Sequence, residues 1–288
     1  MTLCLRSHLH GVSMKKRFVV IFIVSLWTTV TAAELRVMTL NAEWLWTPFD
    51  HKVDGSKFNK GDMSEADYLA EISFYASLVS QHNVQILAIS EIENSLVAAH
   101  LAGKLGGRWR AYFKQGRDTA TGQDVAILSN LQLVKGTVTD FGFPSGTIDG
   151  SNKSKRLSKL VGAQFWEGKA DVSSKVGVIT SHFLSKRNDS KAKSDNRQRQ
   201  AVALVKAVNK VRKETDKLIV MGDFNDYLHT PTLVILRDQK RLLSVSVGAR
   251  KDKVRIDHIL YQGLREKQSQ LVDLKTYSDH DALMSVFY

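Results

Sequence analysis

Carboxylate, amide and imidazole side chains recur in this sequence directly beside apolar runs. Asp223 and Asn225 stand two residues apart after such a run, so in an extended chain both face the same side. Asp257 lies within a largely apolar segment, where a carboxylate is costly unless it is partnered, and His280 is a natural partner. These groups can neutralise a phosphate, activate a water and assist a leaving alkoxide, which phosphodiester hydrolysis requires. A hard cation such as Mg²⁺ prefers oxygen ligands and keeps several waters, so one or two carboxylates suffice.

Each short motif also has a plainer interpretation. Residues 222–226 suit a turn with Asx hydrogen bonds, and residues 278–281 suit a solvated loop. Glu91 can simply end a strand, although Glu93 nearby leaves room for a metal site. A histidine such as His182 is, taken alone, more often a surface or packing residue than a catalyst. The chemistry therefore depends on the set of motifs and not on any one of them.

The lone cysteine, Cys4, excludes several classes of site. No intramolecular disulfide can form, and neither cysteine-based zinc ligation nor a catalytic thiol is expected. Any metal must be held by oxygen or imidazole.

The N-terminal residues predict export. Basic residues 15–17 precede an apolar stretch at 18–26, and small residues at 31–33 suit cleavage. We expect residues 1–33 to be a signal peptide, with Met14 as an alternative start, and the mature protein to be secreted or periplasmic. No stable membrane anchor is expected, because the apolar stretch is shorter than the roughly 20 residues that span a bilayer.

Four segments with strand character each run directly into a polar residue. A strand delivers the polar groups at its end, so four repetitions predict one shared edge. The four strands are expected at 35–40, 86–90, 176–181 and 218–221, before Asn41, Glu91, His182 and Asp223. A further strand is expected at 254–261, and a loop at 278–281.

Amphipathic helices are expected between these strands. One carries Leu69, Ile72, Ala76 and Val79 on one face behind a Ser64 cap. Another carries Ala201, Leu204, Val205, Val208 and Val211 on one face. Pro231 suits a helix start, Gly106 suits a helix end, and the lysine-rich residues 185–196 are expected to form an exposed loop. Without repeats or linkers, residues 34–288 are interpreted as one catalytic domain.

Taken in order, the motifs resemble those of the endonuclease/exonuclease/phosphatase superfamily, which includes deoxyribonuclease I-like nucleases. The match covers nearly the whole mature chain. The resemblance implies an α/β fold in which a two-sheet β-sandwich is flanked by helices in four layers, α/β/β/α. Seven segments carry it: 39–43, 90–94, 124–128, 181–186, 222–226, 256–260 and 278–280.

The resemblance also implies roles for individual residues. Glu91 is the expected principal metal ligand, with Asn41, Glu43 and Asp279 as contributors; Mg²⁺ is the expected ion and Mn²⁺ the alternative. His280 paired with Asp257 would act in general acid/base chemistry, and Asp223 would orient or deprotonate the attacking water. Asn225 and His182 would bind phosphoryl oxygens and stabilise the transition state.

One further position resembles the family pattern with alternatives beside it, and another departs from the pattern. Arg156 resembles a phosphate-contacting arginine, but Lys155 or Lys159 can serve instead, and a solvated basic loop is an equal alternative. The glutamate that orients the first histidine in deoxyribonuclease I-like enzymes has no clear match here, and Asp118 or Asp124 are its candidate substitutes. His182 therefore lacks an assigned partner.

The expected substrate is nucleic acid. Loss of residues 1–33 removes four of the 41 basic residues and no acidic one, leaving 37 against 29 and a net charge of +8. Trp44 and Trp46 suit stacking on bases or packing in the core. The alternatives are a phosphoesterase of inositol phosphates or sphingomyelin, and a binding protein that has lost catalysis. Basic residues cluster at Arg108, Arg110, Lys114 and Arg117, and at Lys186, Arg187, Lys191, Lys193, Arg197 and Arg199.

Overall fold

The computed structural model describes residues 34–49, 63–117, 123–138, 141–167, 174–240, 242–244 and 255–288. The predicted signal peptide lies outside these ranges. Within them, no helix is long and apolar enough to cross a membrane.

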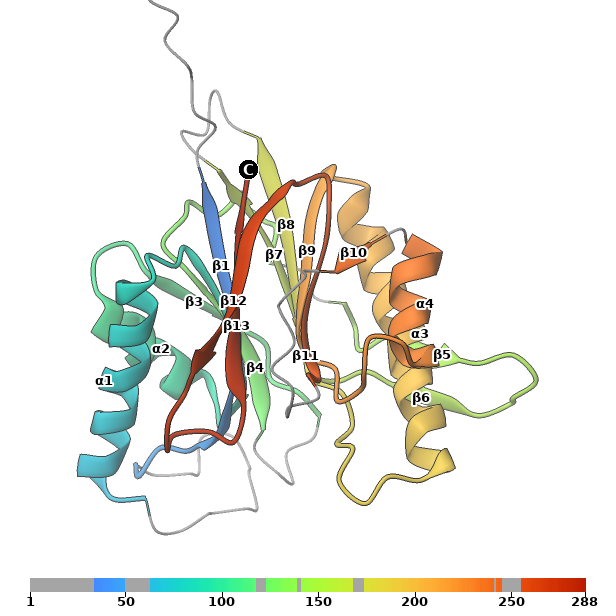
Figure 1. Cartoon of the computed structure of the whole chain (residues 1–288), viewed down its shortest axis with the longest axis horizontal. Coiled ribbons are helices and arrows are strands. Elements are labelled where there is room, and N and C mark those ends of the chain that lie inside the picture. The colour runs from blue at the N-terminus through green and yellow to red at the C-terminus, as the bar shows by residue number, and fades with distance from the viewer. Residues whose placement is uncertain are drawn as a thin grey trace, which may run out of the picture. The chain divides into compact units, whose positions relative to one another are not determined.

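Two β-sheets stack face to face between two pairs of helices (Figure 1). The strands of the six-stranded sheet are, in spatial order, β12 (Glu266–Asp273), β13 (Asp281–Phe287), β1 (Leu35–Leu45), β2 (Ile86–Ile92), β4 (Asp124–Ser129) and β3 (Arg110–Phe113). Those of the five-stranded sheet are β10 (Leu243–Ser244), β11 (Asp257–Gln262), β9 (Lys217–Asp223), β8 (Lys175–Ser181) and β7 (Leu160–Trp166). A separate hairpin, β5 (Ser145–Thr147) with β6 (Ser154–Arg156), packs on α3.

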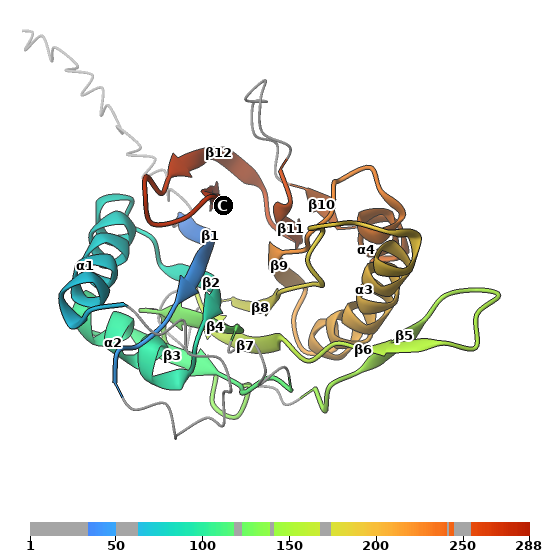
Figure 2. The ribbon, with the colours of Figure 1, turned by 90° about the horizontal axis from the view of Figure 1, so that it is seen from below.

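The helices cover the outer faces of the sheets, so the layers follow the order α/β/β/α seen in Figure 2. On the six-stranded sheet lie α1 (Glu65–Gln81) and α2 (Ser95–Leu105); on the five-stranded sheet lie α3 (Lys191–Arg212) and α4 (Pro231–Lys240). The fold class predicted from the sequence is confirmed.

Side-chain alternation along the strands builds three apolar layers. Val37 packs between the sheets, whereas its neighbour Met38 packs under α1 and α2. In the other sheet, Ile219 faces the first sheet and Val220 faces α3 and α4. Because successive residues of a strand point to opposite faces, each apolar strand serves two cores at once.

The predicted helix boundaries hold in part. Ser64 caps α1 by accepting a hydrogen bond from the Asp67 N–H, and Gly106 caps α2, as expected. However, α3 begins at Lys191 after a Ser190 cap, so the predicted loop at 185–196 is wrong in its second half. Leu69 is 48% exposed and does not share the buried face of α1, because that face is centred on Tyr68, Ile72, Tyr75 and Val79.

At Gly222 the backbone of β9 lies very close to β8. A Cβ at this position would lie 2.1 Å from the Ser181 carbonyl oxygen, and the φ angle of Gly222 is 144°. Only glycine fits here without displacing one of the two strands. The residues directly after this contact, His182 and Asp223, both belong to the candidate site.

Candidate active site

The ends of two parallel strand pairs meet at one end of the sandwich. β1 and β2 run parallel in one sheet, and β8 and β9 run parallel in the other. Asn41, in β1, donates through Nδ2 to Glu91 Oε1 at 3.0 Å and to Asp223 Oδ2 at 3.1 Å. The predicted convergence of these residues is confirmed, and it joins two sheets. The predicted strand end before Asn41 is wrong, because β1 continues to Leu45 beyond an irregularity that follows Asn41.

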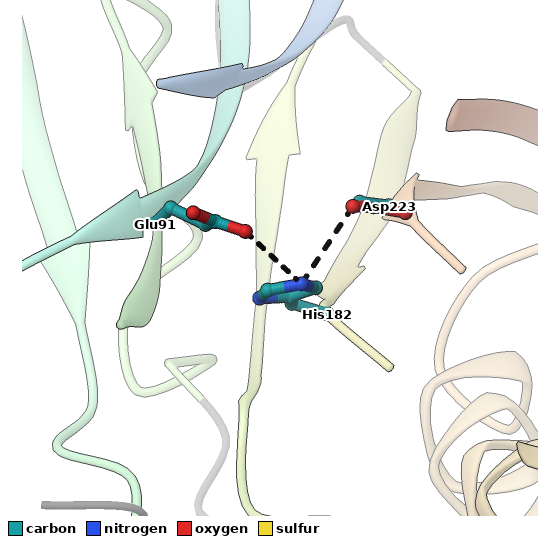
Figure 3. Close-up of side chains that lie close together, drawn as sticks. All are labelled: Glu91, His182 and Asp223. Atoms are coloured by element: carbon teal, nitrogen blue, oxygen red, sulfur yellow. Dashed lines mark ion pairs between the residues drawn. The ribbon is translucent and has the colours of Figure 1, made fainter. Parts of the chain in front are cut away.

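His182 lies between two carboxylates at this junction (Figure 3). Its Nε2 is 3.6 Å from Glu91 Oε1 and 3.6 Å from Asp223 Oδ2. Burial raises the pKa of Glu91, and a hydrogen bond from Asn41 opposes this shift. Burial, together with the charge of Asp257, raises the pKa of Asp223 well above its usual range. Burial lowers the pKa of His182 far below its ordinary value, so a neutral imidazole lies between the two acids.

The other ring nitrogen of His182, Nδ1, is buried and has no hydrogen-bond partner in the described part of the chain. The carboxylate of Asp124 instead accepts hydrogen bonds from the Gly116 N–H at 2.9 Å and from Gln115 Nε2 at 2.7 Å. Asp124 is therefore not the partner that orients His182. The other candidate, Asp118, lies outside the described residues.

The second histidine has the predicted partner. His280 Nδ1 lies 2.6 Å from Asp257 Oδ2. Burial alone would lower the pKa of His280, but the hydrogen bond and charge of Asp257, with the charges of Asp223 and Asp279, raise it to about 10. An imidazolium held by a carboxylate therefore stands beside Asp223, which confirms the pairing expected from the sequence.

Asn225 is held at both ends of its amide. Its Nδ2 donates to Asp223 Oδ2 at 3.1 Å and to the Phe183 carbonyl at 3.2 Å. Its Oδ1 accepts the Lys186 N–H at 3.2 Å. Both amide protons are engaged, so binding a phosphoryl oxygen requires the exchange of one of these bonds.

Glu43 and Asp279 lie at the exposed rim. The Asp279 N–H donates to Glu43 Oε2 at 2.9 Å, and the Asp279 side chain is 73% exposed. Ser278, next in the loop, donates to the Asn41 carbonyl at 2.8 Å and ties the loop to β1. The structure places both predicted ligands near the site without bringing either carboxylate into the buried clusters.

Three of the predicted residues have left-handed backbone conformations. The φ angles are 46° at Glu43, 60° at Glu91 and 49° at Asn225. Such conformations cost on the order of 1 kcal/mol or more each for non-glycine residues, and they persist where the surrounding structure over-determines them. All three residues belong to the set of site residues predicted from the sequence.

The structure shows the surroundings of several of the predicted basic residues. Lys159 is close enough for its charge to lower the pKa of both Glu91 and His182, whereas Arg156 is an exposed residue of the β5–β6 hairpin. Two residues of the predicted basic clusters do not lie on the surface, because Arg197 is fully buried and Arg199 is 6% exposed. The prediction is wrong for these two residues.

The structure decides between the two alternatives for Trp46 and adds one residue, Gln123, to the site. Trp46 is buried, with Trp44 stacked on its ring at 5.7 Å between centroids, so Trp46 is a core residue. Gln123, which sequence reasoning missed, donates through Nε2 to Glu91 Oε2 at 3.0 Å. Its only signal was its place directly before a strand segment that resembles the family.

Glu91, His182 and Asp223 could hold a divalent cation, since one ligand atom of each lies within 4.8 Å of the others. Asp223, Asp257 and His280 form a second such group. Two observations fit a cation: buried carboxylates with raised pKa values converge, and Asp257 Oδ1 is buried without a hydrogen-bond partner in the described ranges. Oxygen and imidazole donors suit Mg²⁺ or Mn²⁺. Such a site at one end of a four-layer sandwich is typical of a cation-assisted hydrolase.

Residues 59–280 match the sequence model of the Endonuclease/Exonuclease/phosphatase family, and the chain belongs to this family. Its members are phosphoric ester hydrolases that depend on divalent metal ions. No curated protein matches the chain by sequence.

Solved structures share the fold at low sequence identity. The endonuclease/exonuclease/phosphatase from Bacteroides vulgatus superposes with a TM-score of 0.63 at 13% identity, over 89% of this chain and 99% of that one. The human Nocturnin catalytic domain with bound sulfate gives 0.60 at 15% identity, over 90% and 95%. A mannosyl-6-phosphatase from Bacteroides thetaiotaomicron gives 0.58 at 13% identity, over 88% and 99%.

Proposed function

We propose that this protein is an exported, Mg²⁺-dependent nuclease that hydrolyses phosphodiesters of DNA or RNA by in-line attack of an activated water. The observation that carries the proposal is the 2.6 Å contact of Asp257 with His280 directly beside buried Asp223. This arrangement places a held imidazolium and a carboxylate together, as acid/base chemistry at a phosphate requires.

The environment of each residue suits it to a different catalytic role. His280, kept protonated by Asp257, donates a hydrogen bond or a proton at the phosphate, and Asp223 orients the attacking water and accepts its proton. Asn225 and neutral His182 donate hydrogen bonds to phosphoryl oxygens.

Glu91 and Asn41 would hold the cation, with Glu43 and Asp279 as contributors at the rim. The bound cation supplies charge neutralisation on the phosphate.

Charge supports a polyanionic substrate. The mature chain carries +8, and Lys159 lies beside the catalytic carboxylates. Exposed Arg108, Arg110 and Arg187 add basic surface outside the site. Long polyanions gain from such distributed charge, whereas a small phosphoester needs only the residues at the centre.

A substrate panel tests the proposal. The purified protein with Mg²⁺ or Mn²⁺ is expected to cleave single-stranded DNA, double-stranded DNA or RNA, and EDTA is expected to abolish cleavage. Glu91→Ala and His280→Ala should be inactive, and equal activity in these variants would refute the assignment. Turnover of sphingomyelin or inositol phosphates without nucleic-acid cleavage would replace the nuclease by a lipid or inositol phosphoesterase.

A matched pair of variants tests which basic residue binds phosphate. Lys159→Gln is expected to raise the KM for nucleic acid about tenfold, because it removes a charge beside the reacting centre. Arg156→Gln is expected to change KM less than twofold. If Arg156→Gln raised KM more than Lys159→Gln, the phosphate-binding residue would be Arg156.

Export is tested on the protein in cells. We expect material recovered from the periplasm or the medium to begin near Glu34 on N-terminal sequencing. Retention of residues 1–33 in all recovered protein would refute cleavage of a signal peptide.

A further inference from the structure

A closed ring of four charged side chains lies behind the Asp223–Asn225 loop. Arg197, in α3, donates through Nε to Asp226 Oδ2 at 3.2 Å and through Nη2 to Asp189 Oδ2 at 2.7 Å. Lys186 Nζ completes the ring, at 2.9 Å from Asp226 Oδ1 and 3.2 Å from Asp189 Oδ2. Two cations and two carboxylates thus join α3, the loop after His182 and the loop after β9.

The ring holds its members in fixed positions but is expected to add little to the free energy of unfolding. Arg197 is fully buried and Asp226 is 1% exposed, and burying such a pair costs about as much as its attraction returns. Nη1 of Arg197 is also buried and finds no acceptor among the residues that the structure describes. An unsatisfied guanidinium N–H is a cost, so selection for stability alone would favour an apolar side chain here.

Asp226 is held on further sides. Thr232 Oγ1 donates to its Oδ2 at 2.8 Å, and the His258 ring contacts its carbonyl oxygen at 2.9 Å. The residue after Asn225 is therefore fixed from α4 and β11 as well as from the ring.

The ring reaches the candidate site through the backbone of Lys186. Its N–H donates to Asn225 Oδ1 at 3.2 Å, and only the oxygen end of an amide can accept this bond. The nitrogen end then faces Asp223 Oδ2 and the Phe183 carbonyl, which accept its two protons and favour the same orientation. If the amide rotated by half a turn, its oxygen would face the Asp223 carboxylate and repel it.

We infer that Arg197 is a positioning residue that sets the orientation of the Asn225 amide, acting through Asp226 and Lys186. Its importance for catalysis rests on the proposed function, in which Asn225 donates to a phosphoryl oxygen. The orientation itself does not depend on that function, so the two can be tested separately.

The side-chain amide of Asn225 reports directly on its orientation. In the full chain labelled with ¹⁵N-asparagine, the Asn225 signal is identified by its loss in Asn225→Asp. Arg197→Met is expected to shift this signal and to speed its hydrogen exchange at least tenfold, because the Lys186 anchor loosens. Arg199→Met is the matched control: Arg199 is buried in the same helix but binds the β5–β6 hairpin through the Lys153 carbonyl and Ser151 Oγ. An unchanged Asn225 signal in Arg197→Met would overturn the inference.

If Arg197→Met does not fold, Asp189→Asn opens the ring from its exposed side and should move the same signal in the same direction. An unchanged signal in a folded Asp189→Asn would overturn the inference equally.

Kinetics supply the second readout. Arg197→Met is expected to lower kcat on the order of tenfold with KM changed less than twofold, because a misaligned donor weakens the transition state. In an Asn225→Ala background the same change should lower kcat less than twofold, since the residue that it positions is gone. A full tenfold loss in both backgrounds would overturn the inference. If the wild-type protein cleaves no phosphodiester, the proposed function fails, while the amide signal still decides the orientation.

Discussion

The two histidines of the site occupy opposite environments. His182 lies buried between Glu91 and Asp223 at 3.6 Å from each, and burial lowers its pKa. His280 contacts Asp257 at 2.6 Å, and its pKa rises to about 10. At His280 a hydrogen-bonded carboxylate, with the charges of Asp223 and Asp279, outweighs burial, whereas at His182 two carboxylates beyond hydrogen-bonding distance do not. One imidazole is therefore suited to carry a proton and the other to remain neutral.

Removing the partner of His280 should produce the largest effect. Asp257→Asn is expected to lower kcat about 10³-fold, because the imidazole loses the charge that keeps it protonated and aligned. Single-turnover and steady-state hydrolysis of the preferred substrate measure this loss. Asp195→Asn is the control, since Asp195 pairs with Lys191 on the surface. A loss below tenfold would show that Asp257 does not set the state of His280.

His182→Asn should have a smaller effect, a loss in kcat of about 10²-fold. The asparagine keeps a hydrogen-bond donor but shifts its position, so part of the stabilisation of the phosphoryl oxygens remains. His82→Asn, far along the chain at the end of α1, is expected to leave kcat unchanged. Unchanged activity in His182→Asn would remove His182 from the catalytic set.

A third histidine, His258, shows an environment in which burial outweighs the opposing charge of a nearby carboxylate, that of Asp226. Burial lowers the pKa of His258 to about 4 from its ordinary 6.5. As the pH falls, His258 therefore binds a proton in the unfolded chain before it does so in the folded chain. The free energy of unfolding decreases between pH 6.5 and 4. Relative to His258→Gln, the wild type should lose about 2 kcal/mol of unfolding free energy from pH 7 to pH 5. Urea unfolding at both pH values measures the difference; a pH-independent gap would contradict the assigned shift.

The smallest expected change in stability concerns Asp223, one of the two carboxylates that face His182. Without a cation, Asp223→Asn is expected to stabilise the protein by about 1 kcal/mol, because it removes a buried charge beside Asp257 while abolishing activity. Urea unfolding in EDTA measures the gain. Added Mg²⁺ or Mn²⁺ should then stabilise the wild type more than the variant. A less stable metal-free variant would show that Asp223 is satisfied by its protein neighbours alone.

Much of the site followed from the sequence because its residues directly follow apolar runs at or near the ends of strands. Asn41, Glu91, His182 and Asp223 each follow an apolar run, and parallel strands bring such ends together. The pairing of Asp257 with His280 followed from the cost of a carboxylate in an apolar strand. The roles of all these residues stay predictions.

Two other features of the structure could not be predicted from the sequence. The start of α3 was missed because its first turns are polar and carry Arg197 and Arg199, whose hydrogen-bond partners come from distant segments and are in place only in the folded chain. The left-handed backbone of Glu91 has no residue-type signal, since glutamate does not favour that conformation. Both features depend on contacts between distant segments, which a local pattern does not encode.

Gly222 allows β9 to lie very close to β8, and the spacing of these two strands sets the distance between Asp223 and His182. Any side chain there would push β9 away from the Ser181 carbonyl and carry Asp223 away from His182. A designer who transfers this set of residues to another parallel strand pair must therefore transfer the glycine with them. Gly222 is therefore required for the geometry of the candidate site although it has no side chain.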